Sequence, residues 1–377
     1  MNWRALLRDE ALPAAIVDLD AVDANLALVL EKSRLPVRLA TKSVRVPWLV
    51  RYLLDRGLRG IMAYSLEETV GLVSLGFDDV LVAYPLAHPG EVRRLGELLG
   101  TGARVMPVID CPEHVELLRP LRARVCIDVD VSLQVAGQHL GVMRSPVRDV
   151  AIARALARRA VDAGLVVDGV MAYEAQVAGV SDGSGVRRAA IGWMKARSVA
   201  LAARRRAEVV AALRADGHPV SVVNGGGSGS LTSTPADVTV TEVTAGSAFL
   251  VGHLFDGYRD LPFRPAGFLA LRVVRRPDAE HVTCFGGGIV ASGATGPDRS
   301  PVVVAPPGLE PLSFEGWGEV QTPFHVPAGC AIDVGDPVIC RPAKSGEWLE
   351  RFPRVLCVRG DTIVERAPTY RGLGWAS

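Results

Sequence analysis

Pro36-Val37-Arg38-Leu39-Ala40-Thr41-Lys42-Ser43-Val44 is the stretch of sequence on which the interpretation of this chain depends. Apolar and β-branched residues before Lys42 predict a buried strand, and the Ser-Val-Arg-Val-Pro after it predicts a loop that enters a helix. Lys42 therefore ends an early strand, at the edge where α/β sheets and barrels build their sites. An amine buried there has a lowered pKa and can act as a nucleophile. The alternative is a lysine that extends from a strand end into solvent.

From residue 14 to about residue 250, short apolar runs alternate with helical patterns. Such alternation is typical of parallel strands joined by crossover helices. About eight units of this kind fit a (β/α)8 barrel, whose usual length is ~250 residues. An open, doubly wound sheet fits the same alternation. The expected strands are residues 15–20, 37–42, 60–64, 80–84, 105–109, 125–129, 169–173, 220–224 and 238–243.

Beyond residue 257 the helical periodicity disappears, and short β-type runs are separated by Gly and Pro. This texture predicts an all-β domain, either a sandwich or a barrel. We therefore expect an α/β barrel domain over residues 1–256, with residues 1–12 open to either domain, and a C-terminal β-domain over residues 257–377. The expected strands of the second domain are residues 269–275, 281–285, 288–291, 301–305, 337–340, 355–358 and 361–365.

The composition is that of a large globular protein with balanced charge. The chain has 377 residues, more than one hydrophobic core normally serves. Forty-two Lys and Arg face 41 Asp and Glu, and a net charge of +1 offers no basic excess for nucleic acid or an anionic membrane. The six cysteines contain no Cys-x-x-Cys pair, the N-terminus lacks a signal-peptide pattern, and no apolar run has membrane-spanning length. We expect a reduced, cytoplasmic protein.

A run of glycines follows the expected strand 220–224. Gly225, Gly226 and Gly227 carry no Cβ, so their backbone N–H groups can converge on an anion, and Ser228 adds a hydroxyl. Barrel enzymes often hold phosphates in the loops after their last two strands. The run therefore predicts a phosphate site, with a flexible Gly/Ser turn as the alternative. A dinucleotide site is disfavoured because its glycine motif belongs in the first βα unit.

The N-terminal motifs carry a resemblance to a known family. Leu12-Pro13-Ala14-Ala15-Ile16-Val17-Asp18-Leu19-Asp20, followed by Asn25 and by the strand that ends at Lys42, resembles the fold-type III pyridoxal-phosphate enzymes, the superfamily of the alanine racemase N-terminal domain. The Arg-Leu-Ala-Thr-Lys-Ser run is most similar to the branch of D-threonine aldolase and D-serine dehydratase. This resemblance implies that pyridoxal phosphate is the cofactor and that Lys42 bonds to it covalently.

The same resemblance implies further site residues. Residues 241–247 are similar to a Thr-Glu-x-x-Pro-Gly-Ser/Thr-Tyr segment of that branch, which implies phosphate contacts from Gly246 and Ser247. Tyr173 stands where the branch has Tyr-x-Gly-His and is a candidate catalytic residue, or else a core residue that ends a barrel strand. His139 stands where relatives carry the Arg of an Arg-x-Gly-Val motif near the cofactor ring.

Two positions near the C-terminus depart from the branch. Relatives bind a divalent metal through a Pro-x-His-x-Cys motif, and here Lys344 takes the place of the His and Gly346 that of the Cys. An ammonium group and a glycine are not metal ligands, and we see no other pairing of His with Cys, so we expect no metal. Residues 344–347 and the C-terminal tail resemble a bacterial subgroup known as amino-acid deaminase/aldolase, which extends the resemblance over nearly the whole chain.

These features predict an enzyme that acts on a small-molecule amino acid. We expect metal-independent, reversible aldol cleavage of a β-hydroxy-α-amino acid to glycine or a small amino acid plus an aldehyde, with Lys344 or His325 as the base. Racemisation, or dehydration and deamination of a D-amino acid, is the alternative. A non-catalytic carrier of pyridoxal phosphate is disfavoured by the β-domain, and a binder of a phosphorylated metabolite remains as a further class. The resemblance also implies a homodimer.

Overall fold

The computed structural model describes residues 1–375 with the exception of residues 136 and 184. The chain divides into two compact units, each of which contains segments that are distant in sequence. The β-unit comprises Met1–Leu28, Ser43–Val50 and Ser247–Ser377, and the barrel unit comprises Val29–Lys42 and Arg51–Gly246.

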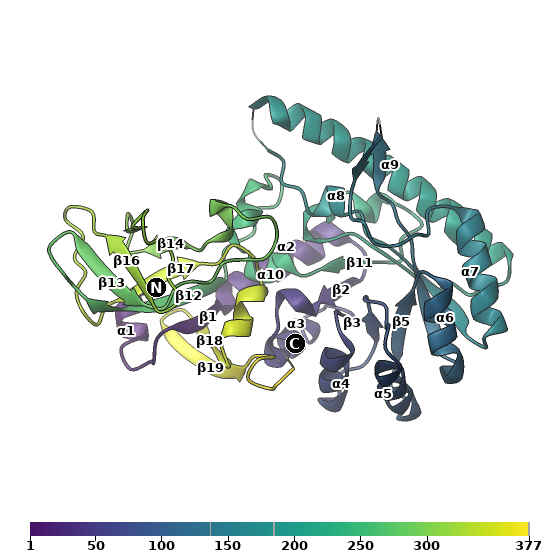
Figure 1. The fold of residues 1–377 in the computed structure, drawn as a ribbon, viewed down its shortest axis with the longest axis horizontal. Coiled ribbons are helices and arrows are strands. Elements are labelled where there is room, and N and C mark those ends of the chain that lie inside the picture. Colours follow the sequence, from purple (N-terminus) through teal and green to yellow (C-terminus); the bar gives the residue numbers. More distant parts are fainter. Residues whose placement is uncertain (136, 184, 376–377) are drawn as a thin grey trace. The chain divides into compact units, whose positions relative to one another are not determined.

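A closed barrel of eight parallel strands forms the centre of the barrel unit within the described residues (Figure 1). Its order is β10-β11-β2-β3-β4-β5-β6-β9, and the pairing of β11 with β2 closes it. The closure confirms the predicted (β/α)8 barrel and excludes the open, doubly wound sheet. The strands are β2 (Val37–Ala40), β3 (Ile61–Ala63), β4 (Val80–Val82), β5 (Val105–Ile109), β6 (Arg124–Asp128), β9 (Val166–Ala172), β10 (Val222–Gly225) and β11 (Glu242–Ala245).

Helices cover the outside of these strands (Figure 1). Helix α7 shows why: Ala153, Leu156, Ala157 and Ala160 recur at helical spacing and are buried, and the Asp149 side chain accepts a hydrogen bond from the first turn. The helices of this unit are α4 (Leu66–Ser74), α5 (Pro89–Gly100), α6 (Pro112–Leu118), α7 (Val150–Asp162), α8 (Ala175–Ala178) and α9 (Gly185–Ala215), with 3-10 turns at Arg119–Leu121, Ser228–Ser230 and Thr234–Ala236, and a hairpin of β7 (Leu133–Val135) and β8 (Gln138–Leu140).

Three elements have residues in both units: α2 (Leu19–Ser33), α3 (Pro47–Leu54) and the 3-10 turn η1 (Thr41–Ser43).

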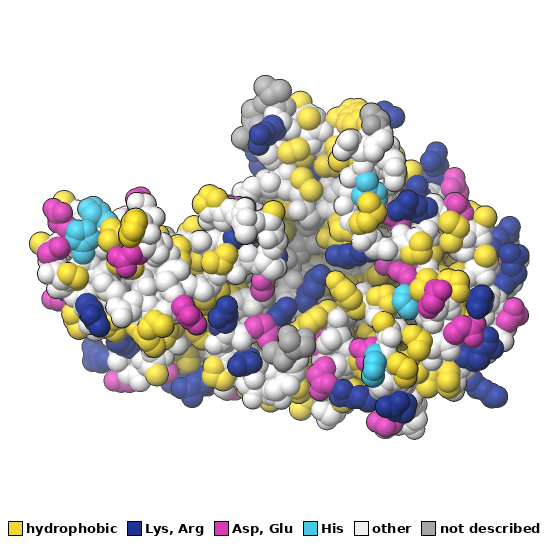
Figure 2. Space-filling model, viewed as in Figure 1, with side chains coloured by type: hydrophobic (Ala, Val, Ile, Leu, Met, Phe, Trp, Pro, Cys, Tyr) yellow, Lys and Arg dark blue, Asp and Glu magenta, His cyan; other side chains and the backbone are white. Residues whose placement is uncertain are grey.

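Lys and Arg side chains are interspersed with Asp and Glu on the face shown in Figure 2, as the near-zero net charge leads one to expect. No helix among the described residues is both long enough and apolar enough to span a membrane.

The β-unit is built on one nine-stranded sheet within the described part of the chain. Its first strand, β1, pairs antiparallel with β12 and parallel with β18. The strands are β1 (Ala14–Asp18), β12 (Gly267–Arg275), β13 (His281–Phe285), β14 (Val302–Ala305), β15 (Glu310–Pro311), β16 (Gln321–His325), β17 (Pro337–Arg341), β18 (Arg354–Arg359) and β19 (Thr362–Pro368). The helices are α1 (Trp3–Leu6) and α10 (Ser247–Leu250), with 3-10 turns at His253–Gly257, Pro297–Arg299 and Glu347–Arg351.

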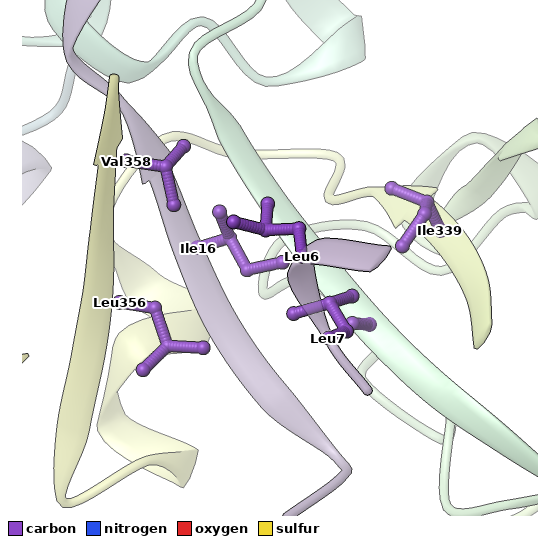
Figure 3. Packing of buried hydrophobic residues seen from close by; sticks show 7 residues of the cluster. Leu6, Leu7, Ile16, Ile339, Leu356 and Val358 are labelled. Carbon is purple, nitrogen blue, oxygen red and sulfur yellow. The ribbon is translucent and has the colours of Figure 1, made fainter. Parts of the chain in front are cut away.

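An apolar cluster joins the N-terminal segment to this sheet. Leu6 and Leu7 lie against Ile16 of β1 and against Leu356 and Val358 of β18 (Figure 3). All five are buried, and burial of a Leu or Ile side chain contributes about 1.5–3 kcal/mol. The first strand of the sequence is therefore a central strand of the β-unit.

The position of β1 corrects one expectation. The sequence analysis placed residues 15–20 in the barrel series, but the structure places β1 in the other sheet. Hydrophobic periodicity shows that a strand is buried and does not show which sheet buries it. The predicted domain boundary after residue 256 stays a prediction, and the chain returns to the β-unit at Ser247.

A second correction concerns the β-unit. The run 288–291 was expected to be a strand and is a loop, because Gly286 and Gly287 have positive φ angles of 78° and 118° and end β13. Strands β15 and β16 were not expected. Each contains a proline, Pro311 at the end of β15 and Pro323 inside β16, and proline is rare inside strands, so a pattern search does not find them.

A buried ion pair lies on the two strands that close the barrel. Arg38 of β2 donates from Nε to Glu242 Oε1 at 2.6 Å and from Nη2 to Glu242 Oε2 at 2.9 Å. Asn224 Nδ2 also donates to Glu242 Oε1, at 2.8 Å. Arg38 also donates from Nη2 to Asp79 Oδ1 at 3.0 Å, and it is 2% exposed, so its buried charge depends on these two carboxylates.

We predict that Arg38→Met lowers the free energy of unfolding by about 3–5 kcal/mol, because it leaves the Glu242 carboxylate buried without its cation. Urea denaturation followed by circular dichroism measures the change. The double variant Arg38→Met/Glu242→Gln should cost less than the sum of the two single variants. Additive costs would show that the two side chains do not act as a pair.

Candidate active site at the carboxyl end of the barrel

Lys42 lies in the turn η1, directly after β2, as the sequence predicts. The preceding Thr41 donates a hydrogen bond from Oγ1 to the Met62 carbonyl at 3.0 Å, which ties this turn to β3. The expectation that the amine is buried is wrong for the chain on its own, because Lys42 is exposed.

Lys42 differs from the other lysines in its place in the fold. The sequence contains four lysines. Lys195 forms an ion pair with Asp182 at 2.6 Å, and Lys344 forms one with Glu347 at 3.3 Å. Lys32 lies in the last turn of α2. Of the four lysines, Lys42 is the one that directly follows a barrel strand, in η1 after β2.

The strand order brings Lys42 close to the glycine loop, which we define as residues 225–228. Strand β11 lies between β10, which ends in this loop, and β2, which ends at η1. Because the strands are parallel, their carboxyl ends meet at one end of the barrel. There Gly246 donates its backbone N–H to Ser228 Oγ at 3.1 Å. The structure therefore gathers Lys42, Ser228 and Gly246 at the carboxyl ends of three neighbouring strands.

Close packing explains the glycines at 225 and 226. A Cβ on Gly225 would lie 2.8 Å from Arg206 Nη1. Gly226 has a φ of +77°, and a Cβ there would lie 3.0 Å from Thr234 Oγ1. Both positions therefore exclude larger residues through contacts with protein atoms.

Gly227 is restricted by another neighbour. A Cβ on Gly227 would lie 3.0 Å from Ala178 Cβ and 3.3 Å from the Tyr173 ring. Tyr173 follows β9 and is partly buried, and burial raises the pKa of its hydroxyl, with Glu174 adding to the effect and Arg144 opposing it. Tyr173 therefore lies beside the glycine loop, and its role in a site stays a prediction.

The backbone amides of the loop differ from the expected open nest. Gly226 donates its N–H to Glu174 Oε2 at 3.1 Å, and Gly227 donates its N–H to Ser230 Oγ at 3.1 Å. These two amides are therefore engaged inside the barrel unit. Donation from Gly225, Gly226 and Gly227 to a phosphate stays a prediction that this geometry does not favour.

His139 lies in the β7–β8 hairpin and is partly buried. Its Nδ1 is 3.3 Å from Gln134 Nε2, and its Nε2 is 3.3 Å from the Val142 carbonyl. Arg144, just beyond the hairpin, has its guanidinium carbon 5.9 Å from the centre of the Tyr173 ring. Arg144 is a cation that the sequence analysis did not consider, although it follows the His-Leu-Gly-Val motif by two residues.

Asp128 is an acidic residue that the sequence analysis also missed. It ends β6, and burial raises the pKa of its carboxyl to about 7. Asp110 and Asp130 add to the increase, and Arg144 opposes it. A carboxyl with this pKa exchanges its proton near neutral pH. An Asp at the end of an expected barrel strand was the signal that could have identified it.

Asp110, Cys111 and His114 form a second missed group, after β5. One ligand atom from each lies within 4.8 Å of the others, an arrangement that could hold a metal ion. The statement that His and Cys are nowhere paired in the sequence was therefore wrong. The Cys-x-x-His spacing after a strand was visible, but only the turn at the start of α6 brings the side chains together.

The two candidates in the β-unit lie in different environments. Lys344 Nζ donates to Ser292 Oγ at 2.7 Å and pairs with Glu347, beside a cavity of about 210 Å³. Its positive charge is thus balanced within its own unit. His325 ends β16 and is exposed, and its ring centre lies 6.0 Å from that of His281.

Comparison with known proteins establishes the family. Residues 17–253 match the family described as alanine racemase, N-terminal domain. The chain belongs to this family. Its members and structural relatives depend on pyridoxal phosphate, which confirms the predicted cofactor. Among curated proteins, no match was found.

Solved structures show the same fold. D-threonine aldolase from Filomicrobium marinum has a TM-score of 0.81 and 23% identity, covering 97% of this chain and 96% of that one. D-threo-3-hydroxyaspartate dehydratase from Delftia sp. HT23 has a TM-score of 0.77 and 19% identity, covering 96% and 98%. Alanine racemase from Clostridium difficile 630 has a TM-score of 0.68 and 14% identity, covering 94% and 98%. These similarities support an enzyme and leave its reaction open.

We predict that Asp128→Asn is as stable as the wild type near pH 4 and more stable than the wild type at pH 8. Because the folded-state pKa is raised to about 7, the native state binds more protons than the unfolded chain between about pH 4 and pH 7. The wild type therefore loses stability as pH rises through this range, and the variant does not. Melting temperatures should agree near pH 4, and the variant should melt higher at pH 8. An equal difference at both values would contradict the raised pKa.

Proposed function

We propose that this protein is a pyridoxal-phosphate enzyme that cleaves β-hydroxy-α-amino acids to glycine or a small amino acid plus an aldehyde. The observation that carries the proposal is that Lys42 and the Ser228–Gly246 hydrogen bond follow neighbouring strands at one end of a closed barrel. A D-threonine aldolase shares the fold over 97% of the chain, which is our reason for taking the aldol reaction as the first candidate. Racemisation or dehydration is the second candidate, because racemase and dehydratase structures share the fold.

The residues at the barrel end fit the cofactor. Lys42 supplies an exposed primary amine for a covalent bond to the aldehyde. Ser228, with its hydroxyl and amide, begins a 3-10 turn beside Gly246, and these groups suit a phosphate. Ser247 and His139 stay predicted contacts. When bound, the cofactor withdraws electrons from the bonds of the amino acid's α-carbon.

The protein must supply a base that removes the proton of the β-hydroxyl. Within the barrel unit, Asp128 has a pKa of about 7 and can hold that proton near neutral pH. Lys344, which pairs with Glu347, and His325 remain candidates from the β-unit. Tyr173, beside the glycine loop, is a candidate for orienting the substrate.

No metal is needed for this proposal. The two positions that carry metal ligands in relatives are Lys344 and Gly346 here. The group of Asp110, Cys111 and His114 follows β5 at the same end of the barrel, so activity lost on chelation and also lost in Cys111→Ser would show that a metal takes part in the reaction. A homodimer and a cytoplasmic location stay predictions.

We predict that borohydride reduction of the protein with pyridoxal phosphate labels Lys42. The four lysines give separable peptides, so mass spectrometry assigns the label directly. Lys42→Arg keeps the positive charge but cannot form the bond, and should take up no label. Lys195→Arg is the matched control and should be labelled as the wild type is. Label on another lysine would contradict the proposed site.

We predict that incubation with a panel of D- and L-β-hydroxy-α-amino acids releases glycine, or a small amino acid, together with an aldehyde. Mass spectrometry of the products separates the reactions. A keto acid with ammonia would indicate dehydration and deamination. Exchange of the α-hydrogen for deuterium without cleavage would indicate racemisation. No turnover of any amino acid by protein that binds the cofactor would contradict the proposed activity.

A further inference from the structure

We propose that Glu174 and Arg206 are positioning residues that hold the glycine loop in the conformation that accepts the cofactor phosphate. The inference rests on the proposed function for the identity of the ligand. Neither residue was singled out for a role by the sequence pattern. Both lie outside the loop, Glu174 at the N-terminus of α8 and Arg206 in α9.

The Glu174 carboxylate holds the loop from two sides. Its Oε2 accepts the backbone N–H of Gly226 at 3.1 Å, and its Oε1 accepts the hydroxyl hydrogen of Thr234. Thr234 is the residue that a Cβ on Gly226 would strike, so the same carboxylate binds the loop and the group packed against it. Glu174 is 1% exposed. Hydrogen bonds to a buried, charged acceptor are stronger than those to a neutral one.

Arg206 supplies the cation for this carboxylate. Its Nη2 lies 3.4 Å from Glu174 Oε2, and its Nε lies 3.4 Å from Asp237 Oδ2. Arg206 is 2% exposed, so it balances two buried carboxylates with one charge. Its Nη1 has no hydrogen-bond partner in the described part of the chain and occupies the space that a Cβ on Gly225 would need. Arg206 is therefore fitted against the loop.

These contacts fix the backbone of two residues of the glycine loop. Because the Gly226 amide is bound to Glu174 and the Gly227 amide to Ser230, their peptide planes are fixed. Ser228 then meets Gly246 at the barrel end. Loss of the Glu174 charge weakens the hydrogen bond at Gly226, a residue with a positive φ of 77°. The loop should then sample other conformations, and phosphate affinity should fall.

The test uses Glu174→Gln, which keeps the side-chain length and one carbonyl oxygen for the Gly226 N–H while it removes the charge. The variant should bind pyridoxal phosphate about tenfold more weakly, the loss expected when a charge-assisted hydrogen bond becomes neutral. The ³¹P resonance of the bound cofactor should shift, and label on Lys42 should persist. Asp182→Asn breaks an ion pair elsewhere in the barrel unit and serves as the control, with unchanged affinity.

Hydrogen exchange of the cofactor-free protein separates this inference from the proposed function. Peptides that contain residues 222–234 should exchange faster in Glu174→Gln than in the wild type, whether or not the cofactor binds. If Glu174→Gln does not fold, Thr234→Val removes the hydroxyl that holds the carboxylate and should show the same changes with smaller size. Unchanged exchange and an unchanged ³¹P resonance in a folded variant would overturn the positioning role. A wild type that binds no pyridoxal phosphate, with faster exchange in the variant, would overturn the proposed function alone.

Discussion

The pairing of β11 with β2 is the constraint on which the rest of the structure depends. Ala245 pairs with Leu39, so the last strand of the barrel lies beside its first. This closure brings the carboxyl ends of β10, β11 and β2 together and places Ser228 near Lys42 despite their distance in sequence. Arg38 contributes a buried ion pair to the same two strands. An open sheet would leave the lysine and the glycine loop at separate places.

The structure changes the meaning of the glycine run. Consecutive glycines were expected to leave their amides open for an anion, yet each glycine is explained by a close protein neighbour, and two of the amides bind side chains. Glycine here permits tight packing of a loop against a buried charge network. We therefore propose Ser228, which follows the glycines, as a contact of the cofactor phosphate.

Much of the fold could be predicted from the sequence, because the barrel strands are short apolar runs at regular spacing. Lys42 could be placed at the end of its strand for the same reason. The membership of β1 in the other sheet could not, since burial alone does not identify a partner strand. Asp128 and Glu174 were missed because their character comes from neighbours that are distant in sequence, including Asp110 and Arg206.

The family determines the cofactor, and the chain's own residues determine the reaction. The site at the barrel end is therefore the central claim to test. The most direct measurement is a crystal structure of the protein soaked with pyridoxal phosphate. We expect electron density that joins the Lys42 amine to the cofactor. The cofactor phosphate should lie within hydrogen-bonding distance of Ser228 and Gly246. A phosphate bound away from Ser228, or a cofactor joined to a different lysine, would contradict it.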